Sequence, residues 1–154
     1  MCRHEEIQRR VAEAWDRGAT EVCLQGGIHP DFDGSTYLSI LRACKEAAPD
    51  IHVHAFSPLE VSHGAATLGI SVADFLSQLR DAGLGSLPGT AAEVLTDRVR
   101  DVICPDKLST AEWLDVVGSA HRAGLHTTST IMFGHVDTLQ DWAQHLLELR
   151  WAAL

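Results

Sequence analysis

The 154-residue sequence lacks any apolar run long enough to cross a membrane. A bilayer-spanning helix needs about 18 to 20 apolar residues, and a signal peptide needs an apolar core that residues 1–6 do not supply. Basic residues are also scarce, with 12 Lys and Arg against 21 Asp and Glu and a net charge of -9. Nucleic-acid binding requires a local basic patch, and the sequence contains none. We therefore expect a cytoplasmic protein that binds neither membranes nor nucleic acid.

Cysteine is sparse, and no two cysteines form a C-x-x-C pair. The four thiols are Cys2, Cys23, Cys44 and Cys104. Such distant cysteines favour free thiols over a disulfide framework. What the chain does contain is typical of a globular protein, with 45% hydrophobic and 21% charged residues. Its length suits one domain, so residues 1–154 are expected to form a single domain.

Helices and strands are predicted to alternate along the chain. Apolar residues at helical spacing, capping boxes and terminal glycines predict helices over 5–17, 35–48, 71–82, 109–123 and 138–151. Short β-branched and apolar runs predict strands over 20–24, 51–56, 84–87 and 126–132. Residues 57–69 are expected to form a loop, and residues 91–103 a segment that is helical in part. The four tryptophans lie in helical stripes and are expected to pack in the core.

This alternation predicts an α/β fold with a parallel sheet. Strands that recur about every 30 to 40 residues, with helices between them, form right-handed βαβ units that collect ligands at their C-terminal strand ends. A closed barrel of this type needs about 250 residues. The present chain offers four predicted strands and begins with a helix. We therefore expect a partial (β/α) barrel that lacks the first and last βα units of a larger one.

Residues that follow the predicted strands are the candidates for chemistry. Gly26 and Gly27 follow the first strand, where they either allow a ligand to approach backbone N–H groups closely or form an ordinary turn. Glu60 and Glu93 follow the second and third strands, where a carboxylate is either solvated or accepts hydrogen bonds from a ribose or an ammonium group. Arg100 is a candidate for gripping a ligand carboxylate.

The pair His52 and His54 points to a second enzyme class. Alternate residues of a strand share one face, so both imidazoles could bind a metal ion at the mouth of a hydrolase barrel. Further ligands would come from His126, His135 and Asp137, although their spacing does not assign them. The alternative is that the two histidines are packed and hydrogen-bonded as ordinary strand residues.

Four stretches of the sequence together carry a family resemblance. They cover residues 18–30, 52–60, 87–95 and 128–135. In these stretches the chain resembles the radical S-adenosylmethionine enzymes of deazaflavin and menaquinone biosynthesis. The motifs Q-G-G-I-H-P at 25–30 and H-A-F-S-P at 54–58 are most similar to the FO synthase family. The similarity is to the half that joins L-tyrosine to a ribityl-aminouracil and that forms the C-terminal module of a fused actinobacterial enzyme.

The resemblance extends over residues 5–150 and implies a radical S-adenosylmethionine barrel with a 4-hydroxybenzyl transferase activity. The glycine pair would meet the amino group of the cofactor, Glu93 and Arg100 its ribose and carboxylate, and residues 132–134 its adenine. The implied cofactor contacts are Gly26, Gly27, Glu93, Arg100, Met132, Phe133 and Gly134. The implied substrate contacts are Gln25, His29, His54, Ser57, Glu60 and His135.

The resemblance implies a 4Fe-4S cluster, but the sequence does not contain the cysteine motif that would bind it. Similar enzymes hold it with a C-x-x-x-C-x-x-C motif, which the four cysteines do not form. In the complete enzyme the cluster would cleave S-adenosylmethionine to a radical, and tyrosine would lose a hydroxybenzyl fragment to the uracil. We therefore expect a fragment without turnover of its own, which a partner chain or a fused module completes. Three alternatives stay open: a related enzyme of menaquinone (futalosine) biosynthesis, the histidine-dependent metal hydrolase, and a non-catalytic interaction module.

Overall fold

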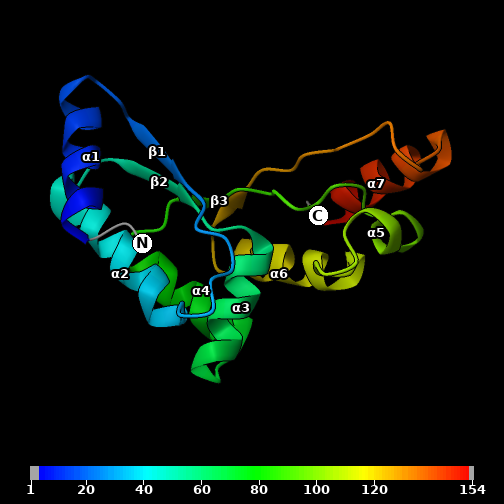
Figure 1. The fold of residues 1–154 in the computed structure, drawn as a ribbon, viewed down its shortest axis with the longest axis horizontal. Coiled ribbons are helices and arrows are strands. Elements are labelled where there is room, and N and C mark those ends of the chain that lie inside the picture. Colours follow the sequence, from blue (N-terminus) through cyan, green and yellow to red (C-terminus); the bar gives the residue numbers. More distant parts are fainter. Residues whose placement is uncertain (1–3, 153–154) are drawn as a thin grey trace.

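A four-stranded parallel sheet with the order β1-β2-β3-β4 runs through the middle of the molecule (Figure 1). The structure is a computed structural model, and it describes residues 4–152. The strands are β1 (Glu21–Leu24), β2 (His52–Ala55), β3 (Ser86–Leu87) and β4 (His126–Thr127). Each strand pairs in parallel with the strand that precedes it in sequence. This arrangement confirms the predicted α/β partial barrel, because consecutive parallel strands with intervening helices build such a barrel wall.

Helices precede, connect and follow the strands. Within residues 4–152 they are α1 (His4–Asp16), α2 (Gly34–Ala47), α3 (Pro58–Leu68), α4 (Val72–Asp81), α5 (Asp97–Ile103), α6 (Thr110–Arg122) and α7 (Leu139–Ala152). Figure 1 shows α2, α3, α4 and α6 on one side of the sheet, and none of the described helices covers the opposite side. No helix of this described part has the length and apolar composition that a membrane span requires.

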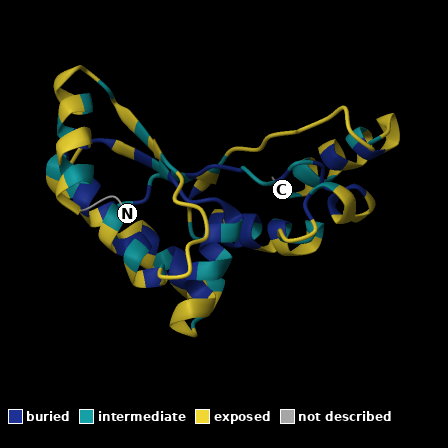
Figure 2. Ribbon diagram, in the orientation of Figure 1, coloured by how far each residue is buried: buried dark blue, intermediate teal, exposed yellow. Residues whose placement is uncertain are grey.

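The two faces of the sheet differ in polarity (Figure 2). Val53, Ala55 and Leu87 are fully buried in the core between the sheet and the helices. Their strand neighbours His52 and Ser86 point to the other face and are exposed or half-buried. Since side chains alternate along a strand, this pattern gives the sheet an apolar outer face and a polar inner face.

Helix α3 occupies most of the segment 57–69 that the sequence predicts as a loop. Ser57 caps the helix, because its hydroxyl accepts a hydrogen bond from the N–H of Glu60, and the Glu60 carboxylate accepts from the Ser57 N–H in return. Pro58 occupies the first helical position, which suits its fixed φ and its missing N–H group. The prediction was wrong because Ser57, Pro58 and Glu60 together form a helix start, which resembles a turn in sequence.

The predicted apolar stripe of α7 is largely exposed. The side chains of Leu139 and Leu146 are 71% and 61% exposed, whereas the helix buries Asp141 and His145. Trp151 is also exposed. The expectation that all four tryptophans pack in the core was wrong, because Trp113 alone is buried, Trp142 is half-buried and Trp15 is exposed like Trp151. Polar side chains are therefore the fully buried ones of α7, while Leu149 and Ala152 pack half-buried against an apolar cluster that includes Trp113.

Candidate functional site

Left-handed backbone conformations are found in the segment that follows each strand. Gly27 follows β1 with φ 66° and Gly134 follows β4 with φ 97°. The non-glycine residues Phe56, Ala91 and Glu93 follow β2 and β3 with φ values of 66°, 63° and 46°. Such a conformation costs a non-glycine residue about 1 to 2 kcal/mol. Strained backbone of this kind clusters at functional sites, so the strand ends are the place to examine in detail.

The buried carboxylate of Glu60 braces the turn after β1. Its Oε1 accepts hydrogen bonds from the N–H groups of Gly26 and Gly27 at 2.7 and 2.9 Å. Its Oε2 accepts from the N–H and the hydroxyl of Ser57 at 2.7 and 2.8 Å. Glu60 and Ser57 are only 2% and 8% exposed. Their polar groups are used within the fold, which argues against the predicted substrate contacts of both residues.

The glycine turn offers acceptors to a ligand, in place of the donors that the sequence suggests. Because Glu60 takes both N–H groups, the carbonyl oxygens are the remaining polar groups, and these suit an ammonium group. The hydroxyl of Tyr37, a residue that the sequence does not single out, donates to the Gly27 carbonyl at 3.3 Å. Burial and the negative charge of Glu60 raise the pKa of Tyr37 to about 12, so its phenol remains a donor at neutral pH.

A cavity of about 1000 Å³ opens beside this turn, between α1, β1 and α2. Gln25, Gly26 and His29 line it together with aromatic side chains that include Phe32 and Phe56. The ring centroids of His29 and Phe32 are 5.1 Å apart. A cavity of this size and mixed lining suits a small organic ligand. The structure thus brings three of the expected site residues to one cavity.

A second group of expected residues meets beyond β3 and β4. The N–H of Met132 donates to the Glu93 carbonyl at 2.9 Å. The Glu93 carboxylate pairs with the ammonium group of Lys107 at 2.8 Å, a partner that the sequence does not indicate. Phe133 packs edge-to-face on Trp142 with centroids 5.2 Å apart. Glu93 and the exposed pair Met132 and Phe133 therefore belong to one continuous surface.

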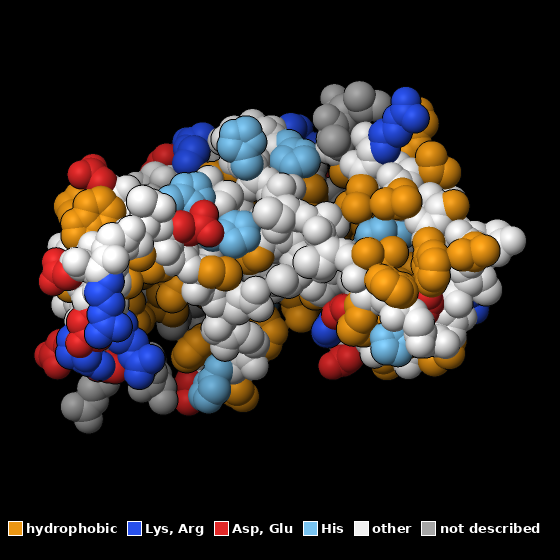
Figure 3. Space-filling view, turned by 90° about the horizontal axis from the view of Figure 1, so that it is seen from above, with side chains coloured by type: hydrophobic (Ala, Val, Ile, Leu, Met, Phe, Trp, Pro, Cys, Tyr) orange, Lys and Arg blue, Asp and Glu red, His pale blue; other side chains and the backbone are white. Residues whose placement is uncertain are grey.

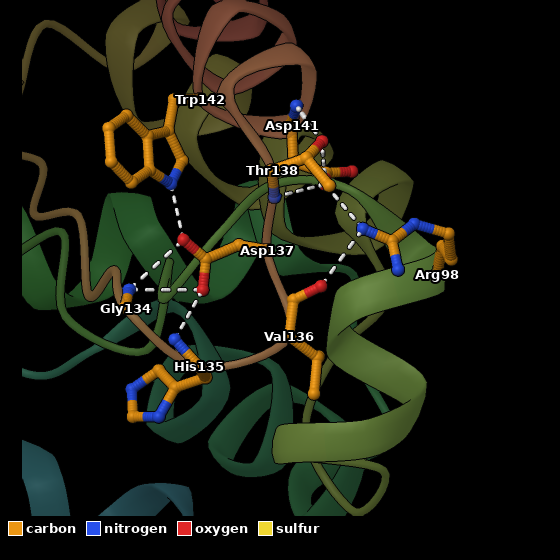
Figure 4. A network of polar contacts seen from close by, with 8 residues as sticks. All are labelled: Arg98, Gly134, His135, Val136, Asp137, Thr138, Asp141 and Trp142. Atoms are coloured by element: carbon orange, nitrogen blue, oxygen red, sulfur yellow. Dashed lines mark hydrogen bonds and ion pairs between the residues drawn. The ribbon is translucent and has the colours of Figure 1, made fainter.

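The loop that carries Gly134 and His135 is fixed by Asp137 (Figure 4). The Asp137 carboxylate accepts hydrogen bonds from the N–H groups of Gly134 and His135 at 3.0 and 2.7 Å, and a further one from the Trp142 indole. These bonds hold the pKa of Asp137 well below its usual range. His135 contributes its backbone N–H group to this loop, and the residue as a whole is exposed.

Arg98 and Arg100, both on α5, differ in their surroundings, because Arg98 is exposed and Arg100 is buried. Arg98 pairs with Asp141 at the start of α7 and donates to the Val136 carbonyl at 3.2 Å (Figure 4). Arg100 is 2% exposed. Its guanidinium donates to three backbone carbonyls, those of Ala91, Ala92 and Leu108. The structure therefore argues against the predicted contact between Arg100 and a cofactor carboxylate, because its donors are already bound inside the fold.

Polar side chains from all four strands share the inner face of the sheet. Strand pairing aligns Glu21 with His52, His54 with Ser86, and Ser86 with His126. Figure 3 shows several histidine side chains gathered around an acidic one in the view from above. The Ser86 hydroxyl lies 2.7 Å from a ring nitrogen of each of His52 and His54. The sequence predicts His54 but misses Ser86, which the alternation along 84–87 would have placed on the same face.

Ligands for a metal ion or an iron–sulfur cluster are not grouped in the described part of the chain. Within residues 4–152, no three His, Cys, Asp or Glu side chains are arranged to hold a metal. Cys44 and Cys104 are buried free thiols and Cys23 is an exposed one, while Cys2 lies outside the described residues. Burial raises the pKa of Cys44 to about 11, away from the thiolate form that a cluster needs. The described residues therefore fit neither a 4Fe-4S cluster nor the hydrolase metal centre.

Curated relatives are similar over nearly the whole chain. A protein of Archaeoglobus fulgidus named 5-amino-6-(D-ribitylamino)uracil--L-tyrosine 4-hydroxyphenyl transferase is 51% identical over 146 residues, which cover 95% of this chain and 43% of the relative. A protein of the same name from Methanococcoides burtonii is 49% identical over 95% of this chain and 41% of the relative. An FO synthase of Streptomyces avermitilis is 50% identical over 94% of this chain and 17% of the relative. The chain thus spans about two fifths of the length of the two transferases.

A family model provides the broader assignment. The model described as "Radical SAM superfamily" matches residues 3–149, which is almost the entire chain. The parallel strands, the helices on their outer side and the strained strand ends agree with a barrel that binds ligands at its C-terminal edge. The chain therefore belongs to the radical SAM superfamily.

Proposed function

We propose that this chain forms the central part of a transferase barrel that couples a hydroxybenzyl fragment of L-tyrosine to 5-amino-6-(D-ribitylamino)uracil in deazaflavin coenzyme biosynthesis. The observation that carries the proposal is the identity of about one half, over nearly the whole chain, to transferases named for these two compounds. The similar FO synthase supports the same assignment. These names favour the tyrosine–aminouracil transferase over the related menaquinone enzymes. The strand-end motifs alone do not distinguish between these two kinds of enzyme.

S-adenosylmethionine is proposed to bind along the C-terminal edge of the sheet. The carbonyl oxygens of the Gly26–Gly27 turn accept from its ammonium group, because Glu60 occupies the N–H groups of the turn. Glu93 contacts the ribose and residues 132–134 contact the adenine. The backbone hydrogen bond between Met132 and Glu93 supports this division, since it places the two segments side by side.

The two substrates are proposed to contact the polar residues that face the cavity and the inner sheet. Gln25 and His29 line the cavity beside Phe32 and Phe56, a combination that suits a planar ring with polar substituents. His54 on the inner face of the sheet and the exposed His135 complete the set. Ser57 and Glu60 are left out of it, because their polar groups brace the fold.

The cluster ligands and the rest of the barrel are proposed to come from a partner chain or a fused module. Two observations support this division. The relatives are more than twice as long as the matching region, and the described cysteines do not form a cluster motif. The chain alone is therefore expected to show no turnover.

We place the protein in the cytoplasm. Cys23, Cys44 and Cys104 are free thiols. Unpaired cysteines suit a reducing compartment, where disulfides are rare. The small molecules in the names of the relatives also suit this location.

A chimera tests the proposed function. The matching 146 residues of the Archaeoglobus fulgidus transferase are replaced by this chain, so that the relative supplies every other part of the protein. We expect the chimera, after anaerobic reconstitution with iron and sulfide, to form the coupled product and 5'-deoxyadenosine from S-adenosylmethionine, L-tyrosine and the aminouracil. A folded chimera that holds a cluster but forms no product overturns the proposal.

Two glycine variants of the chimera test the cofactor contact. Gly27 and Gly124 both have positive φ values, of 66° and 80°, and open space around the position of a Cβ. Gly27→Ala and Gly124→Ala therefore introduce a similar strain, about 1 kcal/mol. We expect Gly27→Ala to weaken S-adenosylmethionine binding in equilibrium dialysis, and Gly124→Ala, which lies just before β4, to leave it unchanged. Equal effects of the two variants contradict a cofactor contact at Gly27.

A further inference from the structure

A chain of polar contacts crosses three strands on the inner face of the sheet. The Ser86 Oγ lies 2.7 Å from Nε2 of His52 and 2.7 Å from Nδ1 of His54. The Glu21 carboxylate lies 3.8 Å from the same Nε2 of His52. Parallel pairing aligns Glu21 with His52 and His54 with Ser86, so the contacts follow from the register of β1, β2 and β3.

The Ser86 hydroxyl couples the two imidazole rings. A serine hydroxyl has one hydrogen to donate, and a neutral imidazole has one nitrogen with a hydrogen and one without. When Ser86 donates to one ring, the other ring must donate its N–H to the Ser86 oxygen. As long as the Ser86 hydrogen is shared with one of these two rings, the tautomer of His52 therefore determines the tautomer of His54.

Glu21 selects one of the two directions. A negative carboxylate favours a hydrogen on the His52 nitrogen that faces it, which is Nε2. His52 then donates from Nε2 to Ser86, and the Ser86 hydroxyl donates to Nδ1 of His54. The ring hydrogen of neutral His54 is consequently on Nε2, which becomes a hydrogen-bond donor.

Gly85 provides the space that this arrangement requires. A Cβ at position 85 would lie only 2.6 Å from Nδ1 of His52, so any side chain there would displace the ring. The consecutive residues Gly85 and Ser86 thus supply both the room for His52 and the hydroxyl that it contacts. This close fit indicates that the orientation of His52 is a specific feature of the sheet.

We propose that Ser86, together with His52 and Glu21, is a positioning residue that holds His54 as an Nε2–H donor for an oxygen acceptor of the substrate. A pyrimidine carbonyl and a phenol oxygen share this chemistry. The identity of the ligand rests on the proposed function, whereas the tautomer of His54 does not. Barrel enzymes bind their ligands at the C-terminal ends of the strands, and His54 is the residue before the last one of β2.

Nitrogen-15 NMR of the histidine-labelled chain tests the tautomers. We expect hydrogens on Nε2 of both His52 and His54 and a bare Nδ1 on His54. Ser86→Ala should give a mixture of tautomers at His54, and Ser86→Thr, which retains the hydroxyl, should restore the pattern. Ser77→Ala on α4 removes an exposed hydroxyl that donates to the Ala73 carbonyl, so this control should change neither ring. A hydrogen on Nδ1 of His54 in the unaltered chain overturns the proposal.

Kinetics of the chimera test the donor role. Ser86→Ala leaves only part of the molecules with His54 as an Nε2–H donor, and an even mixture of tautomers halves the apparent affinity. Ser86→Ala should therefore raise KM for one substrate by a factor of about two with a smaller change in kcat, and Ser77→Ala should change neither. A rise for the aminouracil places the acceptor oxygen on that substrate, and a rise for L-tyrosine places it on the amino acid.

The two experiments separate failure of this inference from failure of the proposed function. Unchanged KM values for both substrates, in an active chimera whose His54 tautomer has changed, overturn the donor role. An inactive chimera counts against the proposed function, and the NMR pattern then decides whether Ser86 positions His54.

Discussion

Glu60 and Glu112 occupy the same position in two capping boxes, but their surroundings differ. Each follows a serine N-cap by three residues and accepts hydrogen bonds from that serine. Glu112 is at the surface, and within residues 4–152 its carboxylate accepts hydrogen bonds from Ser109 only. Glu60 is buried and reaches the turn after β1 as well, so it joins a helix start to a strand end. Sequence spacing identifies the box, but the additional contacts depend on tertiary structure.

Replacement of Glu60 by glutamine should destabilise the chain strongly. Four hydrogen bonds from N–H and O–H donors converge on its carboxylate. Glutamine has one acceptor oxygen, and its NH2 group would face donors. We expect Glu60→Gln to lower the free energy of unfolding by about 2 to 4 kcal/mol in urea denaturation.

Glu112→Gln is the matched control for this prediction. It changes the same position of an exposed capping box, where water can replace the lost acceptor. A much smaller loss of stability is expected there. Equal losses in the two variants would show that capping of α3, and not the brace to the glycine turn, accounts for the effect at Glu60.

At the scale of elements, the contact between β3 and β4 depends on a glycine. A Cβ at Gly89 would overlap the backbone carbonyl of Thr128, and the Gly89 N–H also donates to the Thr128 hydroxyl at 3.0 Å. Backbone cannot move aside as a flexible side chain can. Gly89→Ala should therefore lower the free energy of unfolding by about 2 to 3 kcal/mol, measured by urea denaturation.

Gly118, inside α6, should respond in the opposite direction. A Cβ there meets only the end of the flexible Arg122 side chain, at 3.3 Å. Alanine favours the helix over glycine by about 0.5 to 1 kcal/mol. Gly118→Ala should therefore stabilise the chain, and a destabilisation like that of Gly89→Ala would contradict the interpretation.

The sequence predicts most elements well where the periodicity is strong. It predicts them less well where contacts between elements determine the length of a strand or the buried face of a helix. Apolar stripes and glycine ends locate α1, α2, α4 and α6 to within a few residues. The strands β3 and β4 have two residues each, because the hydrogen-bonded pairing with the neighbouring strand covers less of the chain than the predicted strands 84–87 and 126–132. In α7 the buried residues are Asp141 and His145, whose hydrogen-bond partners come from α5 and the loop before it.

At the scale of the whole molecule, the order of strands and the edge that carries the candidate site follow from the sequence. Alternating elements fix the topology, and the turn residues after each strand indicate the edge. The roles of single side chains do not follow in the same way. Glu60 and Arg100 were predicted as ligand contacts because of their position, but burial and backbone partners decide their role. Ser86 was missed because its partners come from another strand.

Acid is expected to weaken the whole molecule in two stages. The later stage comes from carboxyls whose pKa hydrogen bonds lower in the folded chain. They are Asp33, Asp97, Glu112, Asp137 and Asp141. A group of this kind contributes stability above its unfolded pKa of about 4, and the contribution is lost as the pH falls through the folded value. This stage therefore begins only below about pH 4.5.

His145 produces the earlier stage. Its ring is buried, its Nδ1 accepts from the Leu95 N–H at 3.0 Å, and burial together with the Arg100 charge lowers its pKa. The unfolded chain binds this proton more readily, so stability is lost as the pH falls from about 6.5 toward the folded pKa. Urea midpoints should decline as the pH falls below about 6.5. His145→Asn keeps an acceptor that does not titrate and should remove this decline, whereas His126→Asn, at an exposed position, should retain it.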